Sequence, residues 1–304
     1  MDYLTLAPGL PASSRLGFGC GGVIARAGRG PSLRAIAAAL DGGITHFDVA
    51  RLYGYGEAEA LVGEALAGRR DRVVIASKFG LTATRAAGAL RALKPIAQRL
   101  AASVPGMRPM MRSLVGVAAQ PADRFSPASA QASLDESLAA LRTDYLDILF
   151  LHDCAAGDLR GELAGFLDAQ VTAGKIRAWG VASDIAAVAA LHREWGDALL
   201  YQFPSGIAVP NADRLPAGRR RFICHSPFAG RAGVAARLAG RVAGGDIHRA
   251  MLGYALSVPN VAVVLCSMLD EAHLRANLNA VEHPPFSAAE LASFAAPTLR
   301  APAA

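Results

Sequence analysis

The chain has few cysteines and no long apolar run. Its 304 residues include only Cys20, Cys154, Cys224 and Cys266, whose scattered positions do not match the paired spacing of metal ligands. All four fall in apolar runs, so we expect free, buried thiols in a reducing compartment. No basic-then-apolar leader opens the chain, and no apolar stretch approaches the roughly 20 residues that cross a bilayer. These absences predict a soluble, cytoplasmic protein with no membrane partner.

Charged residues are also sparse, at 18% of the chain, and the excess charge is local. The formal net charge is +6, and residues 81–127 contain seven basic residues against one acidic residue, which accounts for the whole excess. A globally basic surface of the kind that binds nucleic acid is therefore not expected. We interpret the spaced arginines as the solvated face of an inserted helical segment, with a phosphate or membrane-surface patch as the alternative.

Short apolar runs alternate with amphipathic stretches along the chain. The strand-like runs lie near 15–19, 44–48, 73–77, 145–151, 177–181, 199–203, 221–225 and 261–266. The helix-like stretches lie near 32–42, 57–67, 129–142, 161–173, 185–195, 247–257 and 270–281, and residues 205–218 give only a weak helix signal. At 53% hydrophobic the chain can bury a large core. The alternation predicts an α/β fold, a (β/α)8 TIM barrel that forms a single domain over residues 1–304.

Residues 81–127 separate the third predicted strand from its helix by far more than the usual few residues. Spaced apolar residues and several prolines predict short, broken helices in this basic insertion. Because it starts near the rim of the barrel, we expect a lid over a substrate pocket. A disordered or oligomer-contacting insertion is the alternative.

Residues suited to chemistry follow or end the predicted strands, where active sites of such barrels lie. Asp48 ends the second strand, Lys78 follows the third and His152 ends the fourth. Later strand ends carry Ser183, Gln202, His225 and Ser226. One rim is therefore expected to collect all of these side chains.

Asp48, Tyr53, Lys78 and His152 fit the reduction of a carbonyl by a nicotinamide. Negative charge develops on the carbonyl oxygen as hydride reaches the carbon, so a proton donor must be in place. Tyr53 is the candidate acid, with a pKa that the Lys78 ammonium would lower. Asp48 would hold and neutralise the lysine, and His152 would donate to the oxygen. Each residue alone also fits a packing, capping or surface role, but four at three consecutive strand ends favour the joint interpretation.

Several motifs in this order give the chain a family resemblance. They are "GITHFDVARLYGYGEAEALVGEAL", "ASKFG", "TDYLDILFLHD", "IRAWGVAS", "HSPFAG" and "LRANL". The chain resembles the aldo-keto reductase family. The resemblance implies a monomeric or weakly oligomeric (β/α)8 oxidoreductase that uses NADP(H), or less often NAD(H). It also implies that Asp48, Tyr53, Lys78 and His152 form the catalytic tetrad. The stretches "LGFGCGG" and "LHD" look similar to the branch of sugar dehydrogenases such as those acting on L-galactose. A small carbonyl or sugar substrate is implied.

The resemblance also implies residues around the nicotinamide. Ser183 would bind the carboxamide, but Asp184 stands where family members usually have asparagine. Gln202 fits the second amide ligand. His225 replaces the aromatic ring that stacks on the nicotinamide, and the "HSPFAG" motif adds Ser226 and Phe228.

At the adenine end the resemblance implies a second set of contacts. Asn277 matches the residue that reads adenine, and Ser267 and Met268 align with the phosphate-binding turn. Arg275 is a candidate for binding a 2′-phosphate, since guanidinium suits bidentate phosphate contacts, or is an exposed helix charge. NADP(H) is favoured and NAD(H) remains open.

The stretch "GFGCGG" at residues 17–22 matches a dinucleotide-binding fingerprint only formally. That fingerprint needs a helix to open at its third glycine, whereas "VIARAGRGP" intervenes here. We expect Gly21 to allow close backbone approach at the first barrel loop instead. Val23, Phe79 and Asp153 adjoin rim positions and are candidate pocket residues or packing residues.

Two other functions compete with the redox interpretation. A metal-dependent hydrolase could use His46 with Asp48 on one strand face, but such hydrolases commonly carry a His-x-His pair on the first strand. We expect no metal. A subunit that senses cofactor without turnover is the second alternative, and the intact tetrad argues against it.

Overall fold

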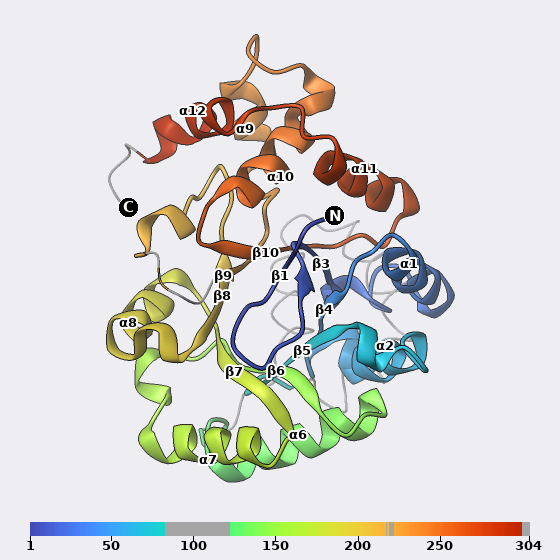
Figure 1. The fold of residues 1–304 in the computed structure, drawn as a ribbon, viewed down its shortest axis with the longest axis vertical. Coiled ribbons are helices and arrows are strands. Elements are labelled where there is room, and N and C mark those ends of the chain that lie inside the picture. The colour runs from blue at the N-terminus through green and yellow to red at the C-terminus, as the bar shows by residue number, and fades with distance from the viewer. Residues whose placement is uncertain (83–121, 217, 219–221, 300–304) are drawn as a thin grey trace, which may run out of the picture.

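The computed structural model describes residues 1–82, 122–216, 218 and 222–299. Eight parallel strands close into a barrel in chain order, with the last strand pairing with the first. The strands are β3 (Leu16–Gly19), β4 (His46–Asp48), β5 (Val74–Phe79), β6 (Leu146–His152), β7 (Ile176–Ala182), β8 (Leu200–Pro204), β9 (Phe222–His225) and β10 (Val261–Cys266). Helices surround this barrel (Figure 1), so the predicted (β/α)8 TIM barrel is confirmed.

The helices of the outer layer begin and end close to the amphipathic stretches of the sequence. They are α1 (Arg29–Asp41), α2 (Ala58–Ala65), α6 (Pro127–Leu141), α7 (Gly161–Thr172), α8 (Ile185–Trp195), α9 (Arg231–Arg237), α10 (Ile247–Ser257), α11 (Glu271–Glu282) and α12 (Ala288–Leu299). Two of them, α9 and α12, were not predicted. Residues 205–216 contain one short 3-10 turn, Ala212–Arg214, in agreement with their weak helix signal.

A small hairpin closes the amino-terminal end of the barrel, and it was not predicted because its strands are two residues long. Strands β1 (Tyr3–Leu4) and β2 (Ser13–Ser14) pair antiparallel just before β3 begins. Between them lie Leu6 and Leu10, which are buried in the same apolar cluster as the barrel-interior side chains of β5 to β10. The opposite, carboxyl-terminal end is therefore the one left for a site.

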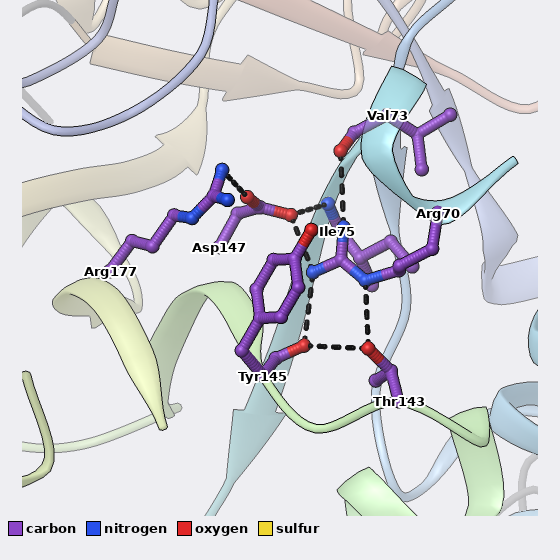
Figure 2. A network of polar contacts seen from close by, with 7 residues as sticks. All are labelled: Arg70, Val73, Ile75, Thr143, Tyr145, Asp147 and Arg177. Atoms are coloured by element: carbon purple, nitrogen blue, oxygen red, sulfur yellow. Dashed lines mark hydrogen bonds and ion pairs between the residues drawn. The ribbon is translucent and has the colours of Figure 1, made fainter. Parts of the chain in front are cut away.

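A polar network fixes β5, β6 and β7 at the amino-terminal end of the barrel (Figure 2). Asp147 is fully buried on β6 and accepts hydrogen bonds from the Ile75 backbone at 2.9 Å, Arg70 at 2.8 Å and Arg177 at 3.0 Å. Both guanidinium groups also lie over the ring of Tyr145. The motif "TDYLDILFLHD" therefore has structural residues at one end and a rim histidine at the other.

The proposed insertion lies largely outside the described residues, which resume at residue 122. Phe125 packs edge-on against Phe79 with 5.9 Å between ring centroids. Ser126 then caps α6 by accepting a hydrogen bond from the Ser129 backbone. The lid and the broken helices between residues 83 and 121 stay predictions.

All four cysteines are buried and free, as expected from their apolar surroundings. Burial raises the pKa of Cys154 and Cys266 to about 12. The thiols of Cys154 and Cys266 are therefore protonated and unreactive at neutral pH. Within the described residues, no helix has both the length and the apolar character of a membrane span.

The network around Asp147 should be a major stabilising feature. Asp147→Asn keeps the side-chain volume but replaces one carboxylate oxygen by an NH2 group, which cannot accept the hydrogen bonds that this oxygen accepted. The free energy of unfolding should therefore fall by about 2–3 kcal/mol. Urea denaturation followed by circular dichroism measures this loss. The exposed Asp41→Asn is the control and should stay within about 0.5 kcal/mol of the wild type. An equal effect of both substitutions would contradict the account.

Candidate active site

The predicted tetrad converges on one cavity at the carboxyl-terminal end of the barrel. This cavity has a volume of about 830 Å³ and is lined by Asp48, Tyr53, Lys78 and His152 together. Asp48 ends β4 and His152 ends β6, as predicted. Lys78 was expected just after its strand but lies inside β5. Three neighbouring parallel strands thus place their catalytic candidates at one rim.

A buried ion pair forms the base of the site. The Lys78 Nζ atom donates to Asp48 Oδ1 at 2.5 Å and to the Val49 carbonyl at 3.1 Å. The Gln202 amide donates to the other Asp48 oxygen at 2.7 Å. All three side chains are at most 5% exposed. Both oxygens of the carboxylate are therefore satisfied, which offsets part of the cost of burying it.

Tyr53 is presented to this ion pair by an irregular turn after β4. The turn spans Tyr53–Gly56, and both Gly54 and Tyr55 adopt left-handed backbone conformations. A side chain on Gly54 would approach the Val23 carbonyl to 3.1 Å, so glycine fits this position for steric as well as conformational reasons. The Lys78 ammonium lies 5.1 Å from the centre of the Tyr53 ring.

The pKa of Tyr53 differs in direction from the sequence-based expectation. Lys78 lowers the pKa of the phenol, but burial and the Asp48 carboxylate outweigh it and the net shift is upward. The pKa of Lys78 is also raised, because Asp48 and Tyr53 more than offset the effect of burial. The site as described therefore holds a protonated phenol beside an ammonium, so Tyr53 is a proton donor here.

His152 completes the tetrad as a neutral imidazole. Its ring meets that of Tyr53 edge-on, with 6.0 Å between centroids. Burial, and then the Lys78 ammonium, lower the pKa of His152 to about 3. Its Nδ1 atom is buried and has no hydrogen-bond partner among the described residues. A neutral imidazole carries one N–H, which suits donation to a substrate oxygen.

Most of the predicted nicotinamide contacts line the same cavity. They are Gly21, Ser183, Asp184, Gln202, His225, Ser226 and Phe228, and Ser267 of the predicted phosphate-binding turn lines this cavity as well. Gly21 lies against Tyr53, since a Cβ there would be 3.8 Å from the phenol ring. The Oε1 atom of Gln202 is buried and has no partner within the described part of the chain. Gln202 lines the cavity, so this oxygen is an unused acceptor on a residue of the cavity wall.

Ser183 and Asp184 already have partners within the protein. The Ser183 hydroxyl donates to the Cys154 carbonyl at 2.7 Å. Asp184 caps α8 by accepting a hydrogen bond from the Ala187 backbone at 2.9 Å, and this explains a carboxylate at that position. The His225 Nδ1 atom lies 2.9 Å from the Ser226 hydroxyl oxygen. Burial lowers the pKa of His225.

A second cavity of about 730 Å³ continues from the first, because Phe228 and Ser267 line both. Asn277 and Arg275 line this second cavity, at the place predicted for the adenine end. Asn277 is buried and its Oδ1 atom lies 2.6 Å from His248 Nε2.

The second cavity also contains basic residues that sequence reasoning missed. These are Arg231, His248 and Arg249, which line the cavity beside His273 of the predicted adenine end. His248 stacks on Phe228 with 4.2 Å between ring centroids, a contact between positions 20 residues apart that no local pattern reveals. Arg231 directly follows the "HSPFAG" motif. This position next to a predicted cofactor-binding motif could have identified Arg231 from the sequence.

Three predicted residues lie outside both cavities. Val23, Phe79 and Met268 are fully buried and line neither one. Phe79 follows Lys78 on β5, and since alternate residues of a strand face opposite sides, it points into the helical layer. Asp153, by contrast, is exposed at the cavity rim with a left-handed backbone conformation.

The described residues give no structural basis for the metal-site alternative. Within them, no group of three or more His, Cys, Asp or Glu side chains is arranged to hold a metal ion. His46 is buried and its Nδ1 atom lies 2.9 Å from the Ser13 hydroxyl. Burial lowers the pKa of His46 to about 4, so it is a neutral barrel residue.

These features define a (β/α)8 barrel whose rim places a phenol, an ammonium, a carboxylate and an imidazole around one cavity. A sequence model described as "Aldo/keto reductase family" matches residues 16–204, more than half of the chain. The chain belongs to this family of oxidoreductases.

Among the curated relatives, a reductase and a dehydrogenase match part of the chain. It is 32% identical over 173 residues to 6-dehydroglucose reductase of Novosphingobium aromaticivorans, over 53% of this chain and 44% of that protein. It is 31% identical over 135 residues to pyridoxal 4-dehydrogenase of Microbacterium luteolum, over 44% and 36% respectively. The aligned part of the chain spans less than half the length of each relative.

Solved structures confirm the fold over nearly the whole chain. The holo form of aldo-keto reductase AKR11C1 from Bacillus halodurans has a TM-score of 0.72 at 21% identity, covering 98% of this chain and 96% of that one. An aldo-keto reductase from Klebsiella pneumoniae in complex with NADPH has a TM-score of 0.61 at 22% identity, with 93% and 90% covered.

The neutral state of His152 should be visible by NMR. Because its folded pKa is far below the value of about 6.5 in an unfolded chain, its ring nitrogens should keep neutral-imidazole chemical shifts from pH 8 down to pH 5. Its contribution to stability is complete above pH 6.5 and is lost as the pH falls toward 3. Nitrogen-15 spectra of histidine-labelled protein, with His152→Gln for assignment, test this. A midpoint near pH 6.5 would contradict it.

Proposed function

We propose that this protein is an NAD(P)-dependent oxidoreductase that interconverts a carbonyl group and an alcohol. The observation that carries the proposal is the convergence of Asp48, Tyr53, Lys78 and His152 on one cavity, with a protonated phenol and a neutral imidazole. One group can supply a proton and the other can orient the oxygen that receives it. This is the arrangement that carbonyl reduction requires.

The cavity residues fit a nicotinamide dinucleotide. The unpartnered Gln202 Oε1 atom is an acceptor for a carboxamide N–H, and the two connected cavities offer an elongated space. A Cβ atom on Gly22 would come within 2.7 Å of Leu269, so glycine lets the backbone of the first loop lie close to Leu269 and Ser267. When bound, a reduced nicotinamide would supply the hydride.

The protein's own residues would handle the proton. Tyr53 donates its hydroxyl proton to the substrate oxygen, and the resulting phenolate is stabilised by the nearby Lys78 ammonium. Asp48 keeps the lysine charged and fixed, and Gln202 completes the carboxylate's hydrogen bonds. His152 donates its N–H to the same substrate oxygen. In the alcohol-oxidising direction, the Tyr53 phenolate accepts the proton instead.

The substrate class we favour is a hydroxylated aldehyde, ketone or aldose. The exposed Asp153 carboxylate follows His152 directly and lies at the rim, where it can accept hydrogen bonds from substrate hydroxyls. The names of two relatives, a 6-dehydroglucose reductase and a pyridoxal 4-dehydrogenase, describe carbonyls on hydroxylated molecules.

NADP(H) is the favoured cofactor because the second cavity is basic. Arg231, Arg249 and Arg275 line it. Arg249 pairs with Asp246 and Arg275 with Glu271, whereas Arg231 makes no ion pair with any described residue. Arg231 is therefore a stronger candidate than Arg275 for contacting a 2′-phosphate.

Removal of the Tyr53 hydroxyl separates binding from chemistry. Tyr53→Phe should lower kcat by about 10²–10⁴-fold, because it removes the general acid, while the dissociation constant for NADPH stays within about twofold. Steady-state rates with a panel of aldehydes and aldoses, together with NADPH fluorescence titration, measure both. Retained turnover by Tyr53→Phe would exclude the proposed proton donor.

Cofactor preference should depend on Arg231 and Arg275. Arg231→Ala should weaken NADPH binding about 10-fold and leave NADH binding almost unchanged, and Arg275→Ala should act in the same direction but less strongly. Fluorescence titration of each variant with both nucleotides measures this. Equal weakening of both nucleotides, or a wild-type preference for NADH, would show that no 2′-phosphate is bound here.

A further inference from the structure

A buried carboxylate behind the tetrad connects the two segments that carry Tyr53 and Lys78. Glu59 lies in the first turn of α2 and is 1% exposed. Its Oε1 atom accepts a hydrogen bond from the Ser77 hydroxyl at 2.6 Å. Its Oε2 atom accepts one from the Arg51 guanidinium at 3.2 Å. A single carboxylate therefore joins a helix, a barrel strand and the loop after β4.

Both partners of Glu59 are close in sequence to the catalytic side chains. Ser77 immediately precedes Lys78 on β5, and since alternate residues of a strand face opposite sides, Ser77 faces α2 while Lys78 faces the barrel interior. Arg51 lies two residues before Tyr53 in the loop. The carboxylate thus links both catalytic segments, through the side chains of Ser77 and Arg51, from outside the barrel.

Among the described residues, the loop has two further attachments to β5 and one to α6. One is the Val49 carbonyl, which accepts a hydrogen bond from Lys78 Nζ at 3.1 Å. At its start, the Val49 backbone donates to the Ala76 carbonyl at 2.9 Å. The other end of the Arg51 guanidinium pairs with Glu136, whose side chain is 62% exposed. Because exposed ion pairs contribute little, Glu59 is the partner that fixes Arg51.

We propose that Glu59 is a positioning residue for the reaction: by bonding Ser77 and Arg51 together, it sets the distance between the Tyr53 hydroxyl and the Lys78 ammonium. This inference rests on the proposed function for its catalytic consequence. A displacement of about 1 Å in a reacting group can cost about 100-fold in rate. A buried ion pair is by itself weak evidence for stability, whereas a carboxylate bonded at two ends does constrain geometry.

The protein contains its own control for this idea. Asp147 is as deeply buried as Glu59 and is also bonded to arginine, but it lies at the amino-terminal end of the barrel, away from the cavity. Asp147→Asn should reduce stability and leave kcat within about twofold of the wild type. It separates a loss of stability from a loss of positioning.

Three variants test the connection through Glu59. Ser77→Ala removes one bond, and Glu59→Met removes both at similar volume. Each should lower kcat by about 10- to 100-fold with the NADPH dissociation constant unchanged. Glu59→Gln can still accept from Arg51 and donate to Ser77, so it should stay within about threefold of the wild type. A kcat for Glu59→Met equal to that of Asp147→Asn would overturn the proposal.

A second readout needs no turnover. Protein labelled with 3-fluorotyrosine is titrated by fluorine NMR, and Tyr53→Phe identifies the Tyr53 signal among the six tyrosines. Ser77→Ala and Glu59→Met should raise the midpoint of Tyr53, because the ammonium moves away from the phenol, while Asp147→Asn should not. An unchanged midpoint in the first two variants contradicts the proposal. If the wild type reduces no carbonyl, the proposed function fails, and this titration still decides the positioning role.

Discussion

The buried ion pair between Asp48 and Lys78 is the interaction on which the site depends. A carboxylate and an ammonium are costly to bury, and such a pair is not an efficient way to stabilise a fold. Here both oxygens of the carboxylate accept hydrogen bonds, and the ammonium also reaches the Val49 carbonyl. The geometry that results places a fixed positive charge 5.1 Å from the centre of the Tyr53 ring.

The charge balance of this pair explains the protonation states around it. Lys78 lowers the pKa of the Tyr53 phenol, but burial raises it, and Asp48 partly cancels the lysine charge, so the net shift of the pKa is upward. The same ammonium, with burial as the larger cause, keeps His152 neutral. One residue can therefore give a proton and another can donate a hydrogen bond without either carrying a charge beforehand.

The barrel and the tetrad could be predicted from the sequence because their signals are local. Each strand is a short apolar run with a polar residue at or near its end, and parallel strands bring those ends together. The N-terminal hairpin could not be predicted, because two-residue strands carry no periodicity. His248 was also missed, because its stacking on Phe228 and its contact with Asn277 depend on packing between distant segments. The direction of the Tyr53 pKa shift required the burial and distances that only the structure provides.

The measurement that tests the central claim most directly is isotope transfer from NADPH that carries two deuterium atoms at nicotinamide C4. Wild-type protein is incubated with this cofactor and an aldehyde or aldose, and the product is examined by deuterium and carbon-13 NMR. The account predicts deuterium bound to the carbinol carbon of the product, formed by the wild type and nearly absent with Tyr53→Phe. Product without deuterium at that carbon, or consumption of substrate without NADPH, would contradict it.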